Sequence, residues 1–162
     1  MNNPTPIKRS PQLQSLSREH HDGLLFVWKV KQGLRNHISM ERMRRYTSWF
    51  WRNHMTPHFY QEEKILLPLF PHAHELAARL KNEHEEMLEL LVSVDREADS
   101  HDLVSLINFV EKHIRWEERE FYHYLEQNLT TAEMNEVKEK LEKHPVSCNQ
   151  EWPDEFWLKQ PI

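Results

Sequence analysis

Glycine is scarce in this sequence, with only Gly23 and Gly33 among 162 residues. A β-sandwich or barrel joins many short strands by tight turns, and such turns need residues that adopt positive φ. The scarcity therefore argues against those folds and favours a few long helices. Hydrophobic residues make up 38% and charged residues 29% of the chain, which is typical of amphipathic helices with one face in water.

Cysteine, long apolar runs and excess positive charge are also missing. Cys148 is the single cysteine, so no disulfide forms within the chain, and no apolar run is long enough for a secretion signal or a membrane span. The net charge is −5, and the short basic runs at 8–9 and 42–45 indicate solvated helix faces. We therefore expect a cytoplasmic protein that binds neither nucleic acid nor membrane.

The spacing of apolar residues predicts four long helices, at about 15–36, 39–66, 72–97 and 101–128. Pro57 falls inside the second helix and predicts a kink or a break there. Short connections make neighbouring helices antiparallel, so the expected fold is an all-α, up-down-up-down four-helix bundle.

Segments outside the four helices complete the expected organisation. Residues 1–12 contain three prolines and predict an extended N-terminal arm before a bundle domain at 13–128. Residues 129–162 follow as a short fifth helix and an aromatic tail. Thr130 and Glu133 form the capping-box motif of that helix, at about 131–143, and Pro145 ends it. We expect the tail to pack on the bundle.

Histidine is abundant, with 12 residues, and two of them begin a repeated pattern. His58 precedes Glu62 by four positions, and His113 precedes Glu117 by four positions. Residues at i and i+4 share one face of a helix, and in both cases that face is apolar. One such pair is usually an exposed pair, but two on core-facing helices indicate a metal site, because imidazole and carboxylate suit iron, manganese or zinc.

The other two predicted helices supply further core-facing histidines. His84 lies between Leu80 and Met87 on an apolar face, and in the first helix either His20 or His21 is placed to point inward. Upstream leucine spacing favours His20. One histidine from each helix and two carboxylates can hold two ions, with Glu62 and Glu117 as bridges. Six protein ligands leave coordination positions open to water, hydroxide or dioxygen.

The order of these motifs resembles the hemerythrin-like family, also called the HHE cation-binding domain. The matching segments are Glu19-His20, His58 to Glu62, Glu83-His84 and His113 to Glu117, within about residues 13–128. The resemblance implies a four-helix bundle, two iron ions bridged by oxo, hydroxo or water, and interaction with oxygen or related species. It also favours His20 over His21 as the ligand, because both Glu-His dipeptides then match.

Two departures from the family argue against reversible oxygen transport. The oxygen carriers have a second histidine one turn before the third-helix ligand, where this chain has Leu80, and their fourth-helix carboxylate lies one residue further from its histidine. The sequence leaves four candidates to fill the gap: His21, His54, Glu63 and Glu118.

The predicted function is that of a non-haem di-iron protein that binds or reacts with oxygen, nitric oxide or peroxide, in sensing or protection. The alternative is an iron-handling or structural metal-binding bundle without redox turnover, in which zinc or manganese can replace iron. A ferritin-like site needs Glu-x-x-His on two helices, and this chain has only Glu120 with His123. The aromatic run at 49–51 suits either core packing or a homodimer contact.

Overall fold

The computed structural model describes residues 8–96, 100–146 and 151–159, and Cys148 lies outside them. Every regular element in these residues is helical, which confirms the all-α class. The main helices are α1 (Gln14–Arg35), α2 (Met40–Phe50), α3 (Thr56–Gln61), α4 (Glu75–Arg96), α5 (His101–Trp116), α6 (Tyr122–Asn128) and α7 (Thr131–Lys143). Thr130 and Glu133 cap α7 reciprocally, as the motif predicts.

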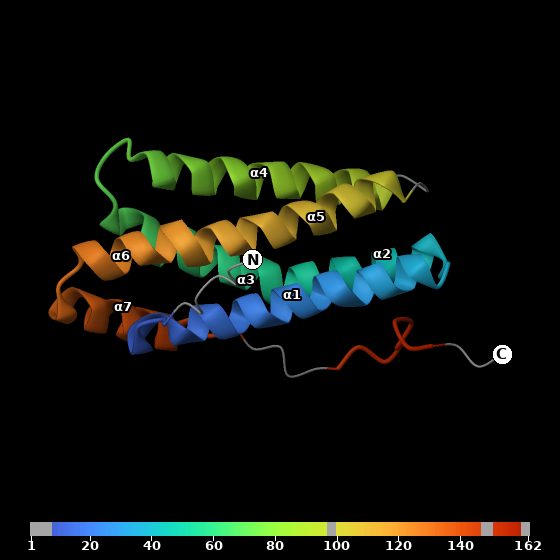
Figure 1. Ribbon diagram of the computed structural model, residues 1–162, viewed down its shortest axis with the longest axis horizontal. Coiled ribbons are helices and arrows are strands. Elements are labelled where there is room, and N and C mark those ends of the chain that lie inside the picture. Colours follow the sequence, from blue (N-terminus) through green and yellow to red (C-terminus); the bar gives the residue numbers. More distant parts are fainter. Residues whose placement is uncertain (1–7, 97–99, 147–150, 160–162) are drawn as a thin grey trace, which may run out of the picture.

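Figure 1 shows long helical rods lying side by side, with α7 alongside one end of the assembly. Helix α1 packs against α2 and α5, and α4 packs against the same two helices, so the four enclose a common interior. Within the described ranges, no helix is both long and apolar enough to cross a membrane.

Three π-helical turns widen two of the rods without interrupting them. Turn η2 (Trp51–Met55) joins α2 to α3, η3 (Glu62–Leu66) follows α3, and η5 (Glu117–Phe121) joins α5 to α6. Pro57 has no N–H and would collide with a carbonyl in the preceding turn, and η2 lies directly before it. The rod therefore passes the proline by widening, and the structure has no break at Thr56.

Both glycines lie where α1 meets a neighbouring segment at very short range. A Cβ atom on Gly23 would lie 2.8 Å from Cδ1 of Ile114 in α5. One on Gly33 would lie 2.9 Å from Met43 Sδ in α2 and equally close to the ring of Phe156. Each glycine thus lies where a side chain would collide with a packed neighbour, and neither has a positive φ.

The hydrophobic core forms two clusters, with a polar layer between them. One cluster lies between α1, α2, α4 and α5 and includes Phe26, Phe50 and Leu106. The other lies toward α6 and α7 and includes Leu16 and Phe121. The buried polar layer consists mostly of histidine and glutamate side chains.

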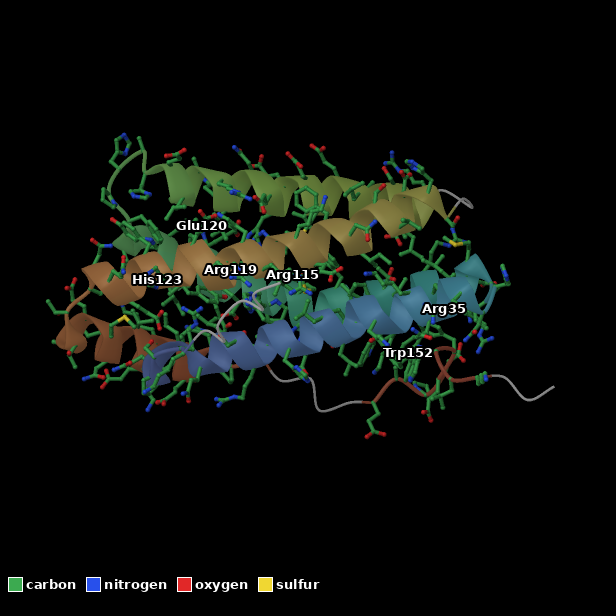
Figure 2. All side chains as sticks on the ribbon, in the orientation of Figure 1. Arg35, Arg115, Arg119, Glu120, His123 and Trp152 are labelled. Atoms are coloured by element: carbon green, nitrogen blue, oxygen red, sulfur yellow. The ribbon has the colours of Figure 1, made fainter. Side chains whose placement is uncertain are left out.

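The C-terminal segment lies against α1 and α2. Phe156 is fully buried, and its ring centroid lies 5.3 Å from that of Tyr46. Figure 2 shows Trp152 on the side of this segment that faces the helices, and its ring centroid is 5.3 Å from that of Trp49. Arg42 donates two hydrogen bonds to Asp154, at 2.6 and 2.8 Å.

We expect Phe156→Ala to lower the free energy of unfolding by about 3–5 kcal/mol, because it empties a fully buried aromatic site. Urea denaturation followed by far-UV circular dichroism measures this change. Leu158→Ala is the matched control, since that side chain is half exposed and its loss should change the free energy by less than about 0.5 kcal/mol. Equal effects of the two substitutions would contradict the docking of this segment.

Candidate metal centre

The six side chains predicted as ligands meet in the buried polar layer, although they come from different elements. His20 lies in α1, His58 in α3, His84 in α4 and His113 in α5, and each is at most 3% exposed. Glu62 and Glu117 are fully buried, and each is the first residue of a π turn. The structure thus brings together all six, whereas His21 is exposed.

Two overlapping ligand groups can be drawn from these residues. The first group contains His20 and His58, and the second contains His84 and His113. Glu62 and Glu117 belong to both groups. Within each group the ligand atoms lie within 4.8 Å of one another. Nε2 of His58 and of His84 lie 3.4 and 3.2 Å from the same oxygen, Glu62 Oε1. On the other side, Glu117 Oε1 contacts Nε2 of His113 and lies 3.7 Å from Nε2 of His20.

Several of these inward-facing atoms are buried without a hydrogen-bond partner. They are Nε2 of His58, His84 and His113, Oε1 of Glu62, and both carboxylate oxygens of Glu117. Buried polar atoms are almost always satisfied in folded proteins, and leaving them unpaired is costly. A cation among converging lone pairs removes that cost, so this donor set fits a metal centre.

Each of the four histidines also has its own outer glutamate, at Nδ1. The Nδ1 atoms of His20 and His58 donate to Glu118 at 2.8 Å and to Glu19 at 2.7 Å. Those of His84 and His113 donate to Glu63 at 3.3 Å and to Glu83 at 3.0 Å. A carboxylate that accepts from Nδ1 leaves the lone pair on Nε2, directed inward, and increases the basicity of the ring.

The outer glutamates follow a rule that repeats in the two halves of the chain. Glu19 directly precedes His20 but accepts from His58. Glu83 directly precedes His84 but accepts from His113. Glu63 directly follows Glu62 and accepts from His84. Glu118 directly follows Glu117 and accepts from His20. Glu63 and Glu118 therefore support histidines and do not join either ligand group. The Glu-His and Glu-Glu dipeptides were the available sequence signal for this shell.

His54, the remaining candidate for an additional ligand, is buried but lies outside both groups. Its Nε2 donates to the backbone oxygen of Glu19 at 2.9 Å, and its ring stacks on Phe50 with centroids 4.7 Å apart. Through this bond it fixes the backbone of the residue whose carboxylate accepts from His58. His54 therefore holds Glu19 in place and is not one of the grouped ligands.

Arg9 corrects one sequence interpretation, because its side chain is buried and does not form a solvated helix face. The guanidinium group pairs with Glu118 at 2.9 Å and with Glu126 at 2.6 Å, and it also contacts the backbone oxygen of Glu118. Residues just before α1 thereby cover the carboxylate that holds His20.

Tyr122 is a functional-site residue that sequence reasoning missed. It is fully buried, and its hydroxyl donates to Glu62 Oε2 at 2.8 Å and lies 3.2 Å from Nε2 of His20. Burial and the nearby carboxylates, Glu62 foremost, hold the pKa of Tyr122 well above its ordinary value. Tyr122 lies five residues after Glu117, and residues i and i+5 share a face only across a π turn.

The four histidines of the metal-free centre differ in the direction of their pKa shifts. Burial lowers the pKa of His113 to about 4 and also lowers that of His20. Burial acts in the same direction on His58, but Glu62 and Glu19 outweigh it and raise its pKa to about 10. Burial lowers the pKa of His84, but the nearby carboxylates of Glu62 and Glu63 outweigh it and raise that pKa as well. His58 is therefore protonated at neutral pH beside Glu62, whose pKa is held well below its ordinary value despite burial.

We expect metal binding at pH 7 to release a proton, because a cation must replace the one on Nε2 of His58. The pKa of His58 is raised, so metal affinity should rise with pH from about 6.5 toward 10, by about tenfold per pH unit for each proton displaced. Calorimetry with zinc(II) in buffers of different ionisation enthalpy counts the protons. His21→Gln should leave the count unchanged, and binding without proton release would contradict these ionisation states.

The Glu-x-x-His motif lies away from this centre. Glu120 and His123 are exposed, and Figure 2 shows both on the outer face of the rod formed by α5, η5 and α6, near Arg119. The motif that a ferritin-like site would use is therefore on the surface.

A buried cluster of histidine and carboxylate ligands inside packed helices defines a class of helical cation-binding proteins. The family described as Hemerythrin HHE cation binding domain matches residues 13–125, and the chain belongs to this family. Searches of curated proteins and of solved structures gave no match. The family match and the buried clusters together identify a cation-binding domain whose histidine and glutamate side chains suit a metal ion.

Proposed function

We propose that this protein is a non-haem di-iron protein that binds or reacts with a small molecule such as oxygen, nitric oxide or peroxide. The observation that carries the proposal is the pair of overlapping ligand groups that share Glu62 and Glu117. Shared carboxylates hold two cations close together, and mixed imidazole and carboxylate donors suit iron, with zinc and manganese as competitors. The bundle at 13–128 would form an up-down-up-down scaffold for the ions, flanked by the arm at 1–12 and by residues 129–162.

The residues of the centre have two roles: some would bind the ions, and others orient the ligands. His20, His58, His84 and His113 would each offer Nε2, and Glu62 and Glu117 would bridge. The four outer glutamates hold the rings in place and add negative charge, which favours higher oxidation states of the metal. When bound, the iron ions supply electrons and open coordination positions.

The surroundings of the centre exclude bulk water. Phe59 stacks on His84 with ring centroids 3.7 Å apart, and Trp116 lies 5.9 Å from His113 by the same measure. Arg79 lies over Trp116 and pairs with Glu83, the outer glutamate of His113. Apolar walls of this kind admit a diatomic molecule or peroxide more readily than a large substrate.

Anaerobic loading with iron(II), followed by admission of air, tests the proposal. We expect about two irons per chain and new charge-transfer bands in the visible spectrum. Disappearance of the bands when oxygen is removed would favour binding over one-way oxidation. Two irons without new bands would favour the alternative of an iron-handling or structural bundle, and a chain that binds no iron would overturn the ligand assignment.

A further inference from the structure

Tyr122 reaches into the first ligand group from the beginning of α6. Its side chain is fully buried, and its ring lies nearly parallel to that of His20, at 12° with centroids 5.1 Å apart. The hydroxyl oxygen contacts two atoms that already belong to this group, Glu62 Oε2 at 2.8 Å and His20 Nε2 at 3.2 Å.

Hydrogen bonding accounts for only one of these two contacts. His20 carries its proton on Nδ1, where Glu118 accepts it, so Nε2 presents a lone pair. The phenol has a single proton, and the shorter contact directs it to Glu62. Lone pairs of the phenol oxygen and of Nε2 of His20 therefore face each other, an arrangement that a cation between them would stabilise.

The two separations also match those between neighbouring ligands of one ion. Metal–ligand bonds of about 2.1 Å at right angles place adjacent ligand atoms about 3 Å apart. The contacts of the Tyr122 oxygen with Glu62 and His20 lie close to this value. No movement of helix α6 is needed to bring the oxygen into range.

We propose that Tyr122 is an additional protein ligand of the ion held by His20 and His58. This inference rests on the proposed function and concerns how the two ions differ. The first ion would have five protein ligands and the second, held by His84 and His113, would have four. A small anion or diatomic molecule would then bind at the second ion, on the side of Phe59.

Coordination to iron(III) replaces the O–H bond of the phenol by an iron–oxygen bond that the oxygen lone pair forms. The displaced proton passes to the buffer, and no electron is transferred. Tyrosinate bound to iron(III) gives a broad charge-transfer band in the visible region, and excitation in that band enhances the ring vibrations of the tyrosine. Neither histidine nor carboxylate ligands produce this signature.

The test compares the iron(III)-loaded full chain with Tyr122→Phe, which removes only the oxygen atom. Tyr124→Phe is the matched control, because Tyr124 is two residues away and packs on Phe70 instead. We expect the band and the ring vibrations in the wild type and in Tyr124→Phe, and their complete loss in Tyr122→Phe. Bound iron is measured in all three proteins. Wild type that holds iron but lacks the band would overturn the ligand role and leave the metal centre intact.

A second measurement covers the case in which Tyr122→Phe fails to fold. Wild-type protein labelled with ring-deuterated tyrosine is loaded with iron(III), and its resonance Raman spectrum is compared with that of unlabelled protein. A shift of the enhanced bands supports tyrosine ligation, and unshifted bands overturn it. Wild type that binds no iron would overturn the proposed function and this inference together.

Discussion

Glu117→Gln is expected to reduce bound iron from about two ions per chain to well below one, because Glu117 belongs to both ligand groups. The substitution keeps the size of the side chain and removes its charge. Each ion then loses a bridging carboxylate, and two neighbouring cations lose negative charge that offsets their repulsion.

His113→Ala is the matched comparison, since His113 belongs only to the second group. That variant should keep about one iron per chain, held by His20 and His58. Iron assays after removal of unbound metal, with competition by a graded series of chelators, separate the two outcomes. If Glu117→Gln and His113→Ala both retained one iron, Glu117 would serve one ion only, and the shared-carboxylate arrangement would be wrong.

Removal of the metal is expected to lower the unfolding midpoint of the wild type by roughly 15–30 °C. Each ion adds about 4 kcal/mol when free metal is about 1,000 times Kd, and each kcal/mol moves the midpoint of a chain of this size by about 2–4 °C. The physical cause is the buried lone pairs of His113 and Glu117, which have no hydrogen-bond partner without a cation.

Calorimetric scans with and without chelator measure this shift, and Glu117→Gln supplies the control. That variant should unfold at the same temperature in both conditions, because it binds little metal. In chelator it should unfold above the wild type, since a neutral amide is easier to bury than a carboxylate whose oxygens lack partners. A chelator-independent midpoint for iron-loaded wild type would contradict coupling between the metal and the fold.

The spacing of residues on an α-helix was enough to predict most of the candidate centre. His58 with Glu62, and His113 with Glu117, lie on buried faces because residues four apart share a face. The burial of His20 and His84 follows from the apolar residues around them. These predictions depended on local periodicity, which the sequence records directly, and for His20 over His21 also on the matching Glu-His dipeptides.

The residues and roles that sequence reasoning missed depend on contacts between elements or on departures from α-helical winding. Glu19 binds a histidine 39 positions away and Glu118 one 98 positions away, and neither partner is visible in local spacing. Arg9 precedes the helices, and only the tertiary fold places it against Glu118. Tyr122 faces the centre because η5 has a wider winding than the regular helix that periodicity assumes.

The width of η5 has a consequence for comparison of this chain with related sequences. A π turn contains one residue more than the α-helical turn that it replaces, so loss of one residue between Glu117 and Tyr122 would let the turn rewind as regular α-helix. The tyrosine would then follow the carboxylate by four positions, and because residues four apart share a face of an α-helix, the phenol would still face the buried carboxylates. A one-residue gap in the exposed stretch around Arg119 would therefore remove the wide turn and keep the same inner wall, so an alignment should keep Tyr122 paired with a tyrosine four residues after the carboxylate in a relative that lacks the wide turn.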